Sequence, residues 1–438
     1  MVGLKDISDT YRSHLARVEK SDAGDAFRWL HPLREAAFAR FCELGFPSVR
    51  DEEWRFTNTA PIANTAFAPA PSGEGVDADQ VAPFTLREPG AHRIVFVNGR
   101  FVPALSAAGS LPGGVILGGL CDAAREHRLI VEAHLGQYAT IENHAFSALN
   151  TAMLEDGAFV YVPKGTVVDA PIHLLFLSVA DAAPWVAHPR NLIVTETSSQ
   201  ATIVETYAAL DGGVQFTNAV TEIVAGENTV IDHYRVGCES TEAFHVGALH
   251  LHLRRSSTLT SHSIIFGGAL VRNDIHANLA EEDCECTLNG LYMIEGTQHV
   301  DNHLVIDHAK PHCRSWEYFK GILDGKSRGV FSGRINVHEN AQKTDAKQTN
   351  MSLLLSDHAQ VQSKPQLEIF ADDVKCTHGA TIGQLDDEAV FYLRSRGIKR
   401  EDARSLLTFA FAGENLNKIR VASLRAQLEQ HVRIKLSP

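Results

Sequence analysis

Short strand-like runs dominate the chain from about Gly136 to Gly383, and this stretch constrains the fold more than any other feature. Runs such as FVYVP (159–163), ATIVETY (201–207) and ALHLHL (248–253) alternate in polarity or are rich in β-branched residues. Gly, Asn, Asp or Ser separates such runs roughly every eight to twelve residues, and almost nothing between them has the period of a long helix. This series of strands predicts either a large sandwich or a β-solenoid, and no strict sequence repeat decides between the two.

Helical periodicity flanks the strand-rich region. The stretch 26–45 places apolar residues at helical spacing and ends near Gly45, which predicts an amphipathic helix. Residues 60–90 are rich in Ala, Pro and Gly without a period, which predicts a linker or mobile loop. Three short amphipathic helices are expected after Gly383, and they either pack on their own β-body or present an apolar face to another protein. The expected regions are 1–135 (N-terminal, helical then mixed), 136–383 (β-core) and 384–438 (C-terminal helices).

Composition and charge exclude several classes of protein. The 438 residues are 44% hydrophobic and 21% charged, which is typical of a soluble globular chain. A formal net charge of −13 argues against a general nucleic-acid or anionic-membrane surface. We see no secretory signal at the N-terminus and no apolar run long enough to cross a bilayer. With seven cysteines, an odd number, we therefore expect a cytoplasmic protein with reduced thiols.

One segment superficially matches a nucleotide-binding loop. GILDGKS (Gly321–Ser327) has three residues between its glycines, whereas the phosphate-binding pattern has four. The following VFSGRINV also reads as a strand, where a helix N-terminus should receive the phosphates. If ATP is involved, a partner must bind it.

Three clusters contain residues that could bind metals. His250 and His252 alternate on a strand as in cupins, but no Glu follows them, and an exposed, solvated strand face is favoured. QHVDNHLVIDHAKPHC (298–313) is dense in His and Asp, and hydrogen bonding between coils or across an interface is favoured over a metal site. Cys284 and Cys286 form a C-x-C without the second pair that zinc usually requires.

Cys376 and His378, in ADDVKCTHGATIG, are the strongest ligand candidates. On a strand they share a face, and thiolate and imidazole are common ligands of iron–sulfur and zinc sites. Lys375 is expected to lower the thiol pKa. Two ligands do not complete a site, so another chain would supply the rest. A nucleophilic Cys/His pair is an alternative, although only Asp372 and Asp373 could orient it.

Several long motifs resemble the SufB/SufD family of iron–sulfur cluster assembly scaffolds. Among them are SVRDEEWRFTN (48–58), LNTAMLEDGAFVYVPKG (149–165), QHVDNHLVIDHAKPHC (298–313) and KPQLEIFADDVKCTHGATIGQLD (364–386). Together the motifs cover most of the chain in the family's order. The resemblance implies a mainly β fold, with a right-handed parallel β-helix core flanked by N-terminal and C-terminal α-helical regions.

The resemblance also implies partners and a site. It implies a non-catalytic subunit that pairs with the homologous scaffold SufB and binds the ATPase SufC through its C-terminal helices. The nascent cluster would form at the scaffold contact, with His378 as the functional histidine and candidate metal ligand and Cys376 beside it. SufB carries a Cys close to Asn350 and a Glu at Gly379, so these positions favour a SufD-type chain. The isolated chain would hold no cofactor stably and could form a homodimer, and the complex could carry a flavin.

Two enzyme classes stay open as alternatives. A β-helix enzyme acting on polysaccharide would use the clustered carboxylates of Glu281, Glu282 and Asp283. A cupin-like metalloenzyme would bind a stoichiometric metal ion in the isolated chain. No function is assigned to the remaining cysteines, for most of which buried, inert thiols are expected. These are Cys42, Cys121, Cys238 and Cys313.

Overall fold

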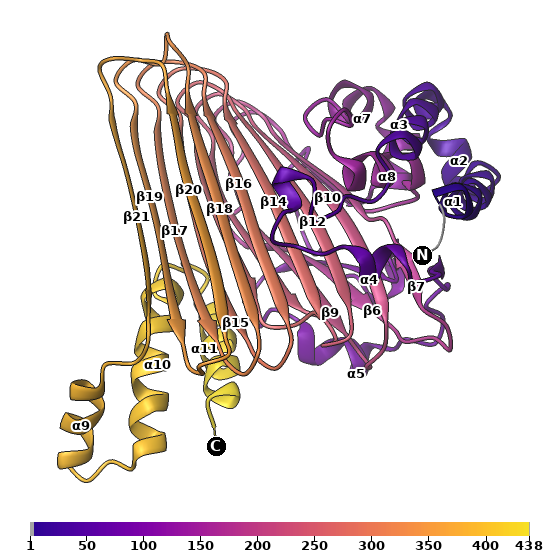
Figure 1. Cartoon of the computed structure of the whole chain (residues 1–438). Helices are drawn as coiled ribbons and strands as arrows, with labels where there is room; N and C mark the ends of the chain where they lie inside the picture. The colour runs from indigo at the N-terminus through magenta and orange to yellow at the C-terminus, as the bar shows by residue number, and fades with distance from the viewer. Residues whose placement is uncertain (1–3, 438) are drawn as a thin grey trace.

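A computed structural model describes residues 4–437, and its centre is a β-helix made of two facing sheets (Figure 1). Sheet A contains β4 (Ile116–Gly119), β5 (Ala158–Val162), β8 (Arg190–Thr195), β10 (Gln215–Ala225), β12 (Phe244–Leu253), β14 (Leu270–Leu279), β16 (His299–His308), β18 (Arg328–Val337) and β20 (Gln360–Ile369), with β1 (Ala68–Pro69) and β7 (Trp185–Ala187) at its side. Sheet B contains β3 (Arg100–Phe101), β2 (His92–Val97), β6 (Ile172–Ser178), β9 (Gln200–Ala209), β11 (Val230–Cys238), β13 (Thr258–Ile265), β15 (Glu285–Ile294), β17 (Arg314–Leu323), β19 (Asp345–Leu354) and β21 (Lys375–Gly383).

From β8 onward, successive strands alternate between the two sheets. Each strand pairs in parallel with the strand two places later, so that Phe244 lies opposite Leu270 and Arg328 opposite Gln360. One coil therefore takes roughly 30 residues, within the range of known solenoid repeats. The prediction of a mainly β fold with a parallel β-helix core is confirmed, and the sandwich alternative is wrong.

Alternating side chains of both sheets fill the interior of the β-helix. Leu249, Leu251 and Leu253 of β12 point inward and pack with Ile203 and Ile231 of the opposite sheet in one continuous apolar cluster. Burial of this apolar surface stabilises each coil only when its neighbours are present, because one coil alone leaves both of its flanks exposed to water.

One corner of each coil repeats the same backbone conformation. A residue with positive φ stands there in six consecutive coils, namely Ser198, Asn228, Ser256, Asp283, His312 and Lys343. The next residue is always Ser, Thr or Cys, and in most coils its side chain donates to the carbonyl three residues earlier, as Ser257 does to Arg254 at 2.6 Å. Cys284 takes the same role with Glu281 at 3.1 Å, and Cys313 donates to that carbonyl at 3.2 Å. Cys284 and Cys313 thus belong to the series of side-chain donors that follow the positive-φ residue of each coil, and we call this series the corner ladder.

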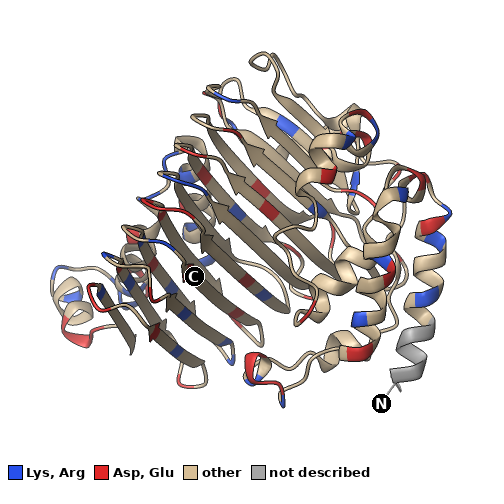
Figure 2. Ribbon diagram, turned by 90° about the horizontal axis from the view of Figure 1, so that it is seen from above, with Lys and Arg blue, Asp and Glu red and all other residues tan. Residues whose placement is uncertain are grey.

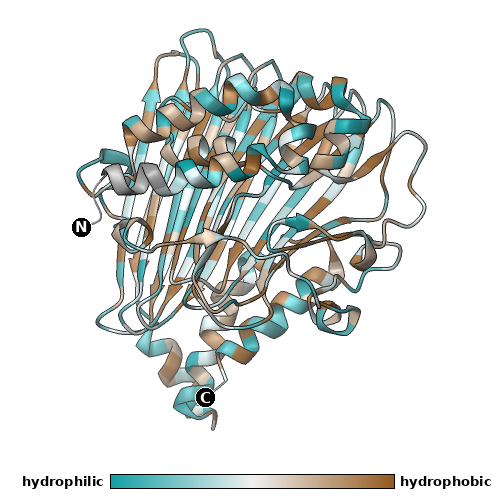
Figure 3. Ribbon diagram, turned by 90° about the vertical axis from the view of Figure 1, so that its right-hand side faces the viewer, coloured by the Kyte–Doolittle hydropathy of each residue, from teal (hydrophilic) through white to brown (hydrophobic). Residues whose placement is uncertain are grey.

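A layer of helices covers the outer face of sheet A over its first coils (Figure 3). These helices are α1 (Leu4–Glu19), α2 (Asp22–Ala26), α3 (His31–Leu44), α6 (Leu120–Glu126), α7 (Arg128–His134) and α8 (Ala145–Met153). Helix α3 packs on α8 through Phe38, Phe41 and Leu149. It ends at Gly45, whose φ of 65° is one that glycine adopts readily, so the helix end predicted there is confirmed.

The segment 60–90 belongs to the packed body. It contains α4 (Ala60–Ala63) and α5 (Ala78–Val81), while β1 pairs with β7. Phe67 and Val81 are buried, so the expectation of a detached linker is wrong, because these few apolar residues anchor an otherwise irregular stretch. Strand β2 pairs with β6, so the sheets also begin well before residue 136.

The three predicted C-terminal helices are confirmed as α9 (Asp387–Ser395), α10 (Arg400–Leu416) and α11 (Ala422–Lys435). The end of α10 and the inner face of α11 pack on the outer face of sheet B, where Leu416, Leu424 and Leu428 contact the cluster around Tyr234 and Ile264. Helix α10 extends to Leu416, because this packing buries its last turn. By contrast, α9 projects away from the β-helix, as seen from the side in Figure 1 and from above in Figure 2. Among residues 4–437, no helix has the length and apolar character needed to cross a membrane.

Candidate functional site

The last coil leaves one end of the β-helix open. Strands β20 and β21 are the terminal strands of sheets A and B, and no described strand pairs with their outer edges. Most side chains of β21 are exposed, including inward-facing ones, because no further coil covers them. The large apolar residues Phe370 and Ile382 lie at this end with exposures of 67% and 47%. An uncovered strand edge with apolar residues is a ready surface for pairing with another chain.

Both sequence-predicted ligands lie on β21 at this open end. Cys376 stands in register with Ala346, and His378 with Gln348, so the two candidates share one face of β21, as predicted, and that face is the inward one. Cys376 is half-buried against the last apolar cluster of the interior, whereas His378 is exposed. The described part of the chain therefore offers one thiol and one imidazole, next to each other, where another chain can reach them.

The expected effect of Lys375 on the thiol is wrong. Burial, followed by the carboxylate of Asp345, raises the pKa of Cys376. Lys375 lies opposite Asp345 in the strand register, and adjacent residues of a strand point to opposite faces. The lysine therefore does not offset the burial of the thiol, and a metal ion or a partner's cation would have to supply the charge that favours the thiolate.

Beneath these two residues lies a polar floor made of Glu317, Gln348 and Asn350. The sequence patterns did not predict it. Gln348, opposite His378, donates from Nε2 to Oε2 of Glu317 on the next coil inward at 2.8 Å. Burial raises the pKa of Glu317 to about 8. The side-chain oxygens Glu317 Oε1, Gln348 Oε1 and Asn350 Oδ1 are buried without a hydrogen-bond partner. The only sequence signal was the presence of polar residues at alternate, inward positions of strands that are otherwise apolar inside.

The histidine-rich segment 298–313 makes hydrogen bonds between coils, as predicted. Asp301 accepts from Arg272 of the preceding coil at 2.5 Å, and His276 bonds Asp307 at 2.5 Å. The carboxylates 281–283 form one of the coil corners, where Glu281 accepts from the backbone of Arg255. GILDGKS covers the end of β17 and the turn to β18, so it precedes a strand and not a helix.

His250 is not on a solvated face, which corrects the prediction. It is 6% exposed, because segments 44–54 and 140–147 fold back over this part of sheet A. Their contact with β12 could not be inferred locally, since both segments lie about a hundred residues or more earlier in the chain. Cys286 is buried in the β-helix core, so the C-x-C pair lines the interior. No group of three or more His, Cys, Asp or Glu side chains in residues 4–437 stands ready to hold a metal ion.

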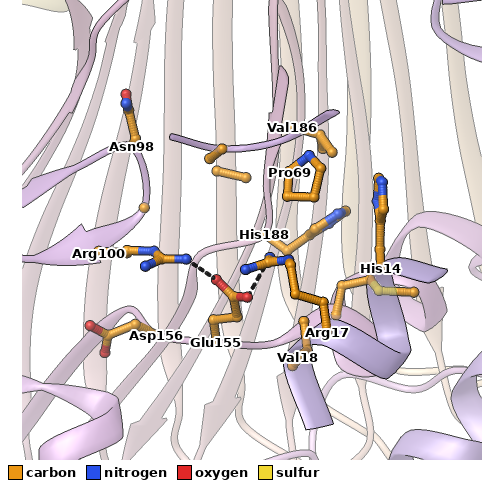
Figure 4. A pocket seen from close by; sticks show the side chains of 14 residues that line it. His14, Arg17, Val18, Pro69, Asn98, Arg100, Glu155, Asp156, Val186 and His188 are labelled. Atoms are coloured by element: carbon orange, nitrogen blue, oxygen red, sulfur yellow. Dashed lines mark hydrogen bonds and ion pairs between the residues drawn. The ribbon is translucent and has the colours of Figure 1, made fainter. Parts of the chain in front are cut away.

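A small cavity at the other end of the molecule ties α1 to the β-helix (Figure 4). Glu155 forms an ion pair with Arg17 of α1 at 2.5 Å and accepts a hydrogen bond from Arg100 of β3 at 3.1 Å. Neighbouring Asp156 is fully buried, which raises its pKa to about 6 although backbone N–H groups of Phe101 and Cys121 bond it. The cavity measures about 30 Å³, which suits one or two water molecules, so we assign it a structural role.

Comparisons with known proteins agree with this geometry. The family described as "SUF system FeS cluster assembly, SufBD core domain" matches residues 177–411, and "SufBD protein N-terminal region" matches residues 5–174. An iron–sulfur cluster assembly SufBD family protein of Synechocystis sp. is 38% identical over 91% of this chain and 89% of its own length. Iron–sulfur cluster assembly protein SufD of Escherichia coli is 32% identical over 91% of each chain. The chloroplastic protein ABCI7 of Arabidopsis thaliana is 30% identical over 92% of this chain and 86% of its own length. The chain therefore belongs to the SufBD family of iron–sulfur cluster assembly proteins.

Proposed function

We propose that this chain is a SufD-type, non-catalytic scaffold subunit that pairs with SufB, binds the ATPase SufC and contributes His378, with Cys376 beside it, to a cluster formed at the scaffold contact. One observation carries the proposal: an incomplete ligand pair lies at the uncovered end of the β-helix, above a polar floor. In the family to which the chain belongs, that end would meet the homologous scaffold.

The open edges of β20 and β21 support pairing with a second β-helix. Their outer backbone groups have no strand partner among the described residues, and a homologous coil could continue both sheets. Exposed Phe370 and Ile382 would add apolar area to the contact. When SufB is absent, a second copy of this chain could use the same edges, and the isolated protein would then form a homodimer.

Helix α9 and the start of α10 support docking of the ATPase. Phe391 and Tyr392 of α9 are 70% and 56% exposed, and Leu406 of α10 is also exposed. Leu416, Leu424 and Leu428 of α10 and α11 are buried against sheet B. Helix α9 carries the exposed aromatic residues of the C-terminal segment, so it is the part best suited to bind a partner. Large exposed aromatic residues are frequent anchors of protein interfaces.

The proposed mechanism is a mechanical one. ATP binding would bring two SufC subunits together, and their attachment through α9 would strain the scaffold pair, so that the contact at the open end changes between two states. Iron and sulfide, which are the cargo, would be held transiently by thiolates of SufB together with His378. The isolated chain would retain no cluster. All seven cysteines are free, which fits a reducing cytoplasm.

Co-purification tests this function. A mild affinity tag on the chain, expressed at native level in its own cells, is expected to recover a P-loop ATPase and a second SufBD-family scaffold in fixed ratios from the cytoplasmic fraction. Isolation of the chain without either companion, together with turnover of a carbohydrate or a stoichiometric iron–sulfur centre in the isolated chain, would contradict it.

A further inference from the structure

A groove lies on the outer face of sheet A, whereas His378 stands on the inward face of the last strand of sheet B. Its floor is formed by β12, β14, β16 and β18, and its walls are segments 44–54 and 140–147. The first of these segments crosses in front of the sheet in Figure 1. The groove has a volume of about 530 Å³. That is large enough for an ion with its water ligands or for a small molecule.

Two imidazoles lie side by side in this groove. His250 of β12 and His276 of β14 are register partners, so their side chains project from the same face of sheet A. Their ring centroids are 6.0 Å apart at an interplanar angle of 88°. Both ring nitrogens of His250 are buried and have no hydrogen-bond partner. Leaving a buried polar atom unpaired costs free energy, so a ring with two such atoms indicates a missing partner such as an ion or water.

The second imidazole is oriented as metal-bound histidines usually are. Nε2 of His276 bonds Oδ2 of Asp307 at 2.5 Å, and the other oxygen of Asp307 accepts from Asn336 at 2.7 Å. A carboxylate on one ring nitrogen fixes the ring and makes the other nitrogen a better ligand. Nδ1 of His276 is thereby left for a ligand in the groove.

The charge of the groove favours a cation. Five carboxylates line it, and of its two guanidinium groups Arg272 is already paired with Asp274 and Asp301. His144, His250 and His276 all line the groove, and neutral imidazole is a common ligand of transition metals in proteins. Neutral imidazole with nearby carboxylate suits first-row transition metals better than Mg²⁺ or Ca²⁺.

We propose that this groove binds a divalent transition-metal ion through His250 and His276, with His144 as the third ligand and Asp307 as the residue that positions His276. Such an ion lies about 2.1 Å from a coordinating nitrogen, so two rings that share it have centroids up to roughly 6.5 Å apart, and the observed spacing fits. In residues 4–437 no three ligands yet converge on one point, so His144 must turn inward. Its ring makes no hydrogen bond within the described chain that would oppose this rotation.

Titration of the full-length, metal-free chain with Co²⁺ tests the proposal. We expect one saturable equivalent with a visible spectrum free of thiolate-to-cobalt charge transfer, because all three ligands are imidazoles. His276→Ala should weaken Co²⁺ binding by at least about tenfold. Asp307→Asn should weaken it by about tenfold, because a carboxylate then no longer orients the ring of His276. His276 is partly exposed, so its replacement leaves the core intact, which thermal unfolding would verify. His250→Ala serves as the second ligand variant.

Two controls separate this site from the proposed cluster site. His358→Ala removes an exposed histidine in the turn before β20, and the double variant Cys376→Ala, His378→Ala removes the candidate cluster ligands. Both should bind Co²⁺ like the unaltered chain. Equal Co²⁺ affinity of the unaltered chain and His276→Ala, or loss of binding with the double variant, would overturn the proposal without touching the scaffold function.

Discussion

His378 on the last strand of sheet B stands directly opposite Gln348, whose amide in turn donates to the buried carboxyl of Glu317. The exposed ligand candidate is thus the outermost member of a polar column that reaches into the interior of the β-helix. Polar groups left without partners in a core cost free energy, and the side-chain oxygens Glu317 Oε1, Gln348 Oε1 and Asn350 Oδ1 are three such groups directly beneath the last coil.

The column predicts a pH dependence of stability. Burial raises the pKa of Glu317 from 4.5 to about 8, so the folded state binds its proton more tightly than the unfolded state. The resulting stabilisation is complete below about pH 4.5 and is lost as pH rises towards 8, on the order of a few kcal/mol. Glu317→Gln keeps the acceptor for Gln348 but cannot ionise. Between pH 5 and 9, the unfolding temperature of the variant should rise relative to that of the unaltered protein as pH rises. Unfolding temperatures that change with pH in parallel would disprove the assignment.

The free edge of β21 predicts that a proline there weakens scaffold pairing. The N–H of Lys375 donates to sheet B's preceding strand, so in a parallel ladder the N–H of alternate residues, including Ala380, faces the open edge. Ala380→Pro removes an edge donor and no bond within the chain, and should lower affinity for the partner scaffold by about tenfold or more. Analytical ultracentrifugation of the two scaffolds would measure this. An unchanged affinity would mean that the scaffolds meet elsewhere.

The projecting helix α9 predicts a separate docking defect. Phe391→Asp and Tyr392→Asp replace exposed aromatic residues and should weaken ATPase binding by about tenfold or more without changing the unfolding temperature. Leu129→Asp is the matched control, because Leu129 is 84% exposed on α7 at the opposite part of the chain. Calorimetric titration with the ATPase gives the affinities. A loss of binding caused equally by the control would rule out a specific role for α9.

The corner ladder predicts that Cys284 acts as a hydrogen-bond donor and not as a cluster ligand. Its thiol donates to Glu281 where other coils use Ser or Thr, so Cys284→Ser should stay within about 1 kcal/mol of the unaltered stability. Cys284→Val removes the donor and should cost about 1–3 kcal/mol. Denaturant unfolding measures both. If Cys284→Ser abolished cluster assembly in the complex while folding normally, the structural role would be wrong.

The sequence allowed the strand-rich core and the C-terminal helices to be predicted, because both follow from local periodicity. The coil repeat was not detectable, since the shared corner property is a positive φ that Ser198, Asn228 and Lys343 all adopt with different side chains. Physical constraints at a corner act on the backbone and on hydrogen bonding, and several residue types satisfy them.

The site was predictable only in part. Cys376 and His378 were identified by alternation on one strand, whereas Glu317 and Gln348 required the register between strands roughly 30 residues apart. The burial of His250 likewise depends on segments from the N-terminal region. Contacts between distant parts of the chain determine these environments, and local patterns do not contain them.

The most direct test is cluster assembly by the complete scaffold–ATPase complex carrying His378→Ala. Iron and acid-labile sulfide per complex should fall at least severalfold, while gel filtration shows the same subunit ratio, because the variant removes a ligand and no docking surface. His358→Ala should assemble clusters normally. Full assembly by the His378→Ala complex would contradict the claim that this chain supplies part of an incomplete ligand set at its open end.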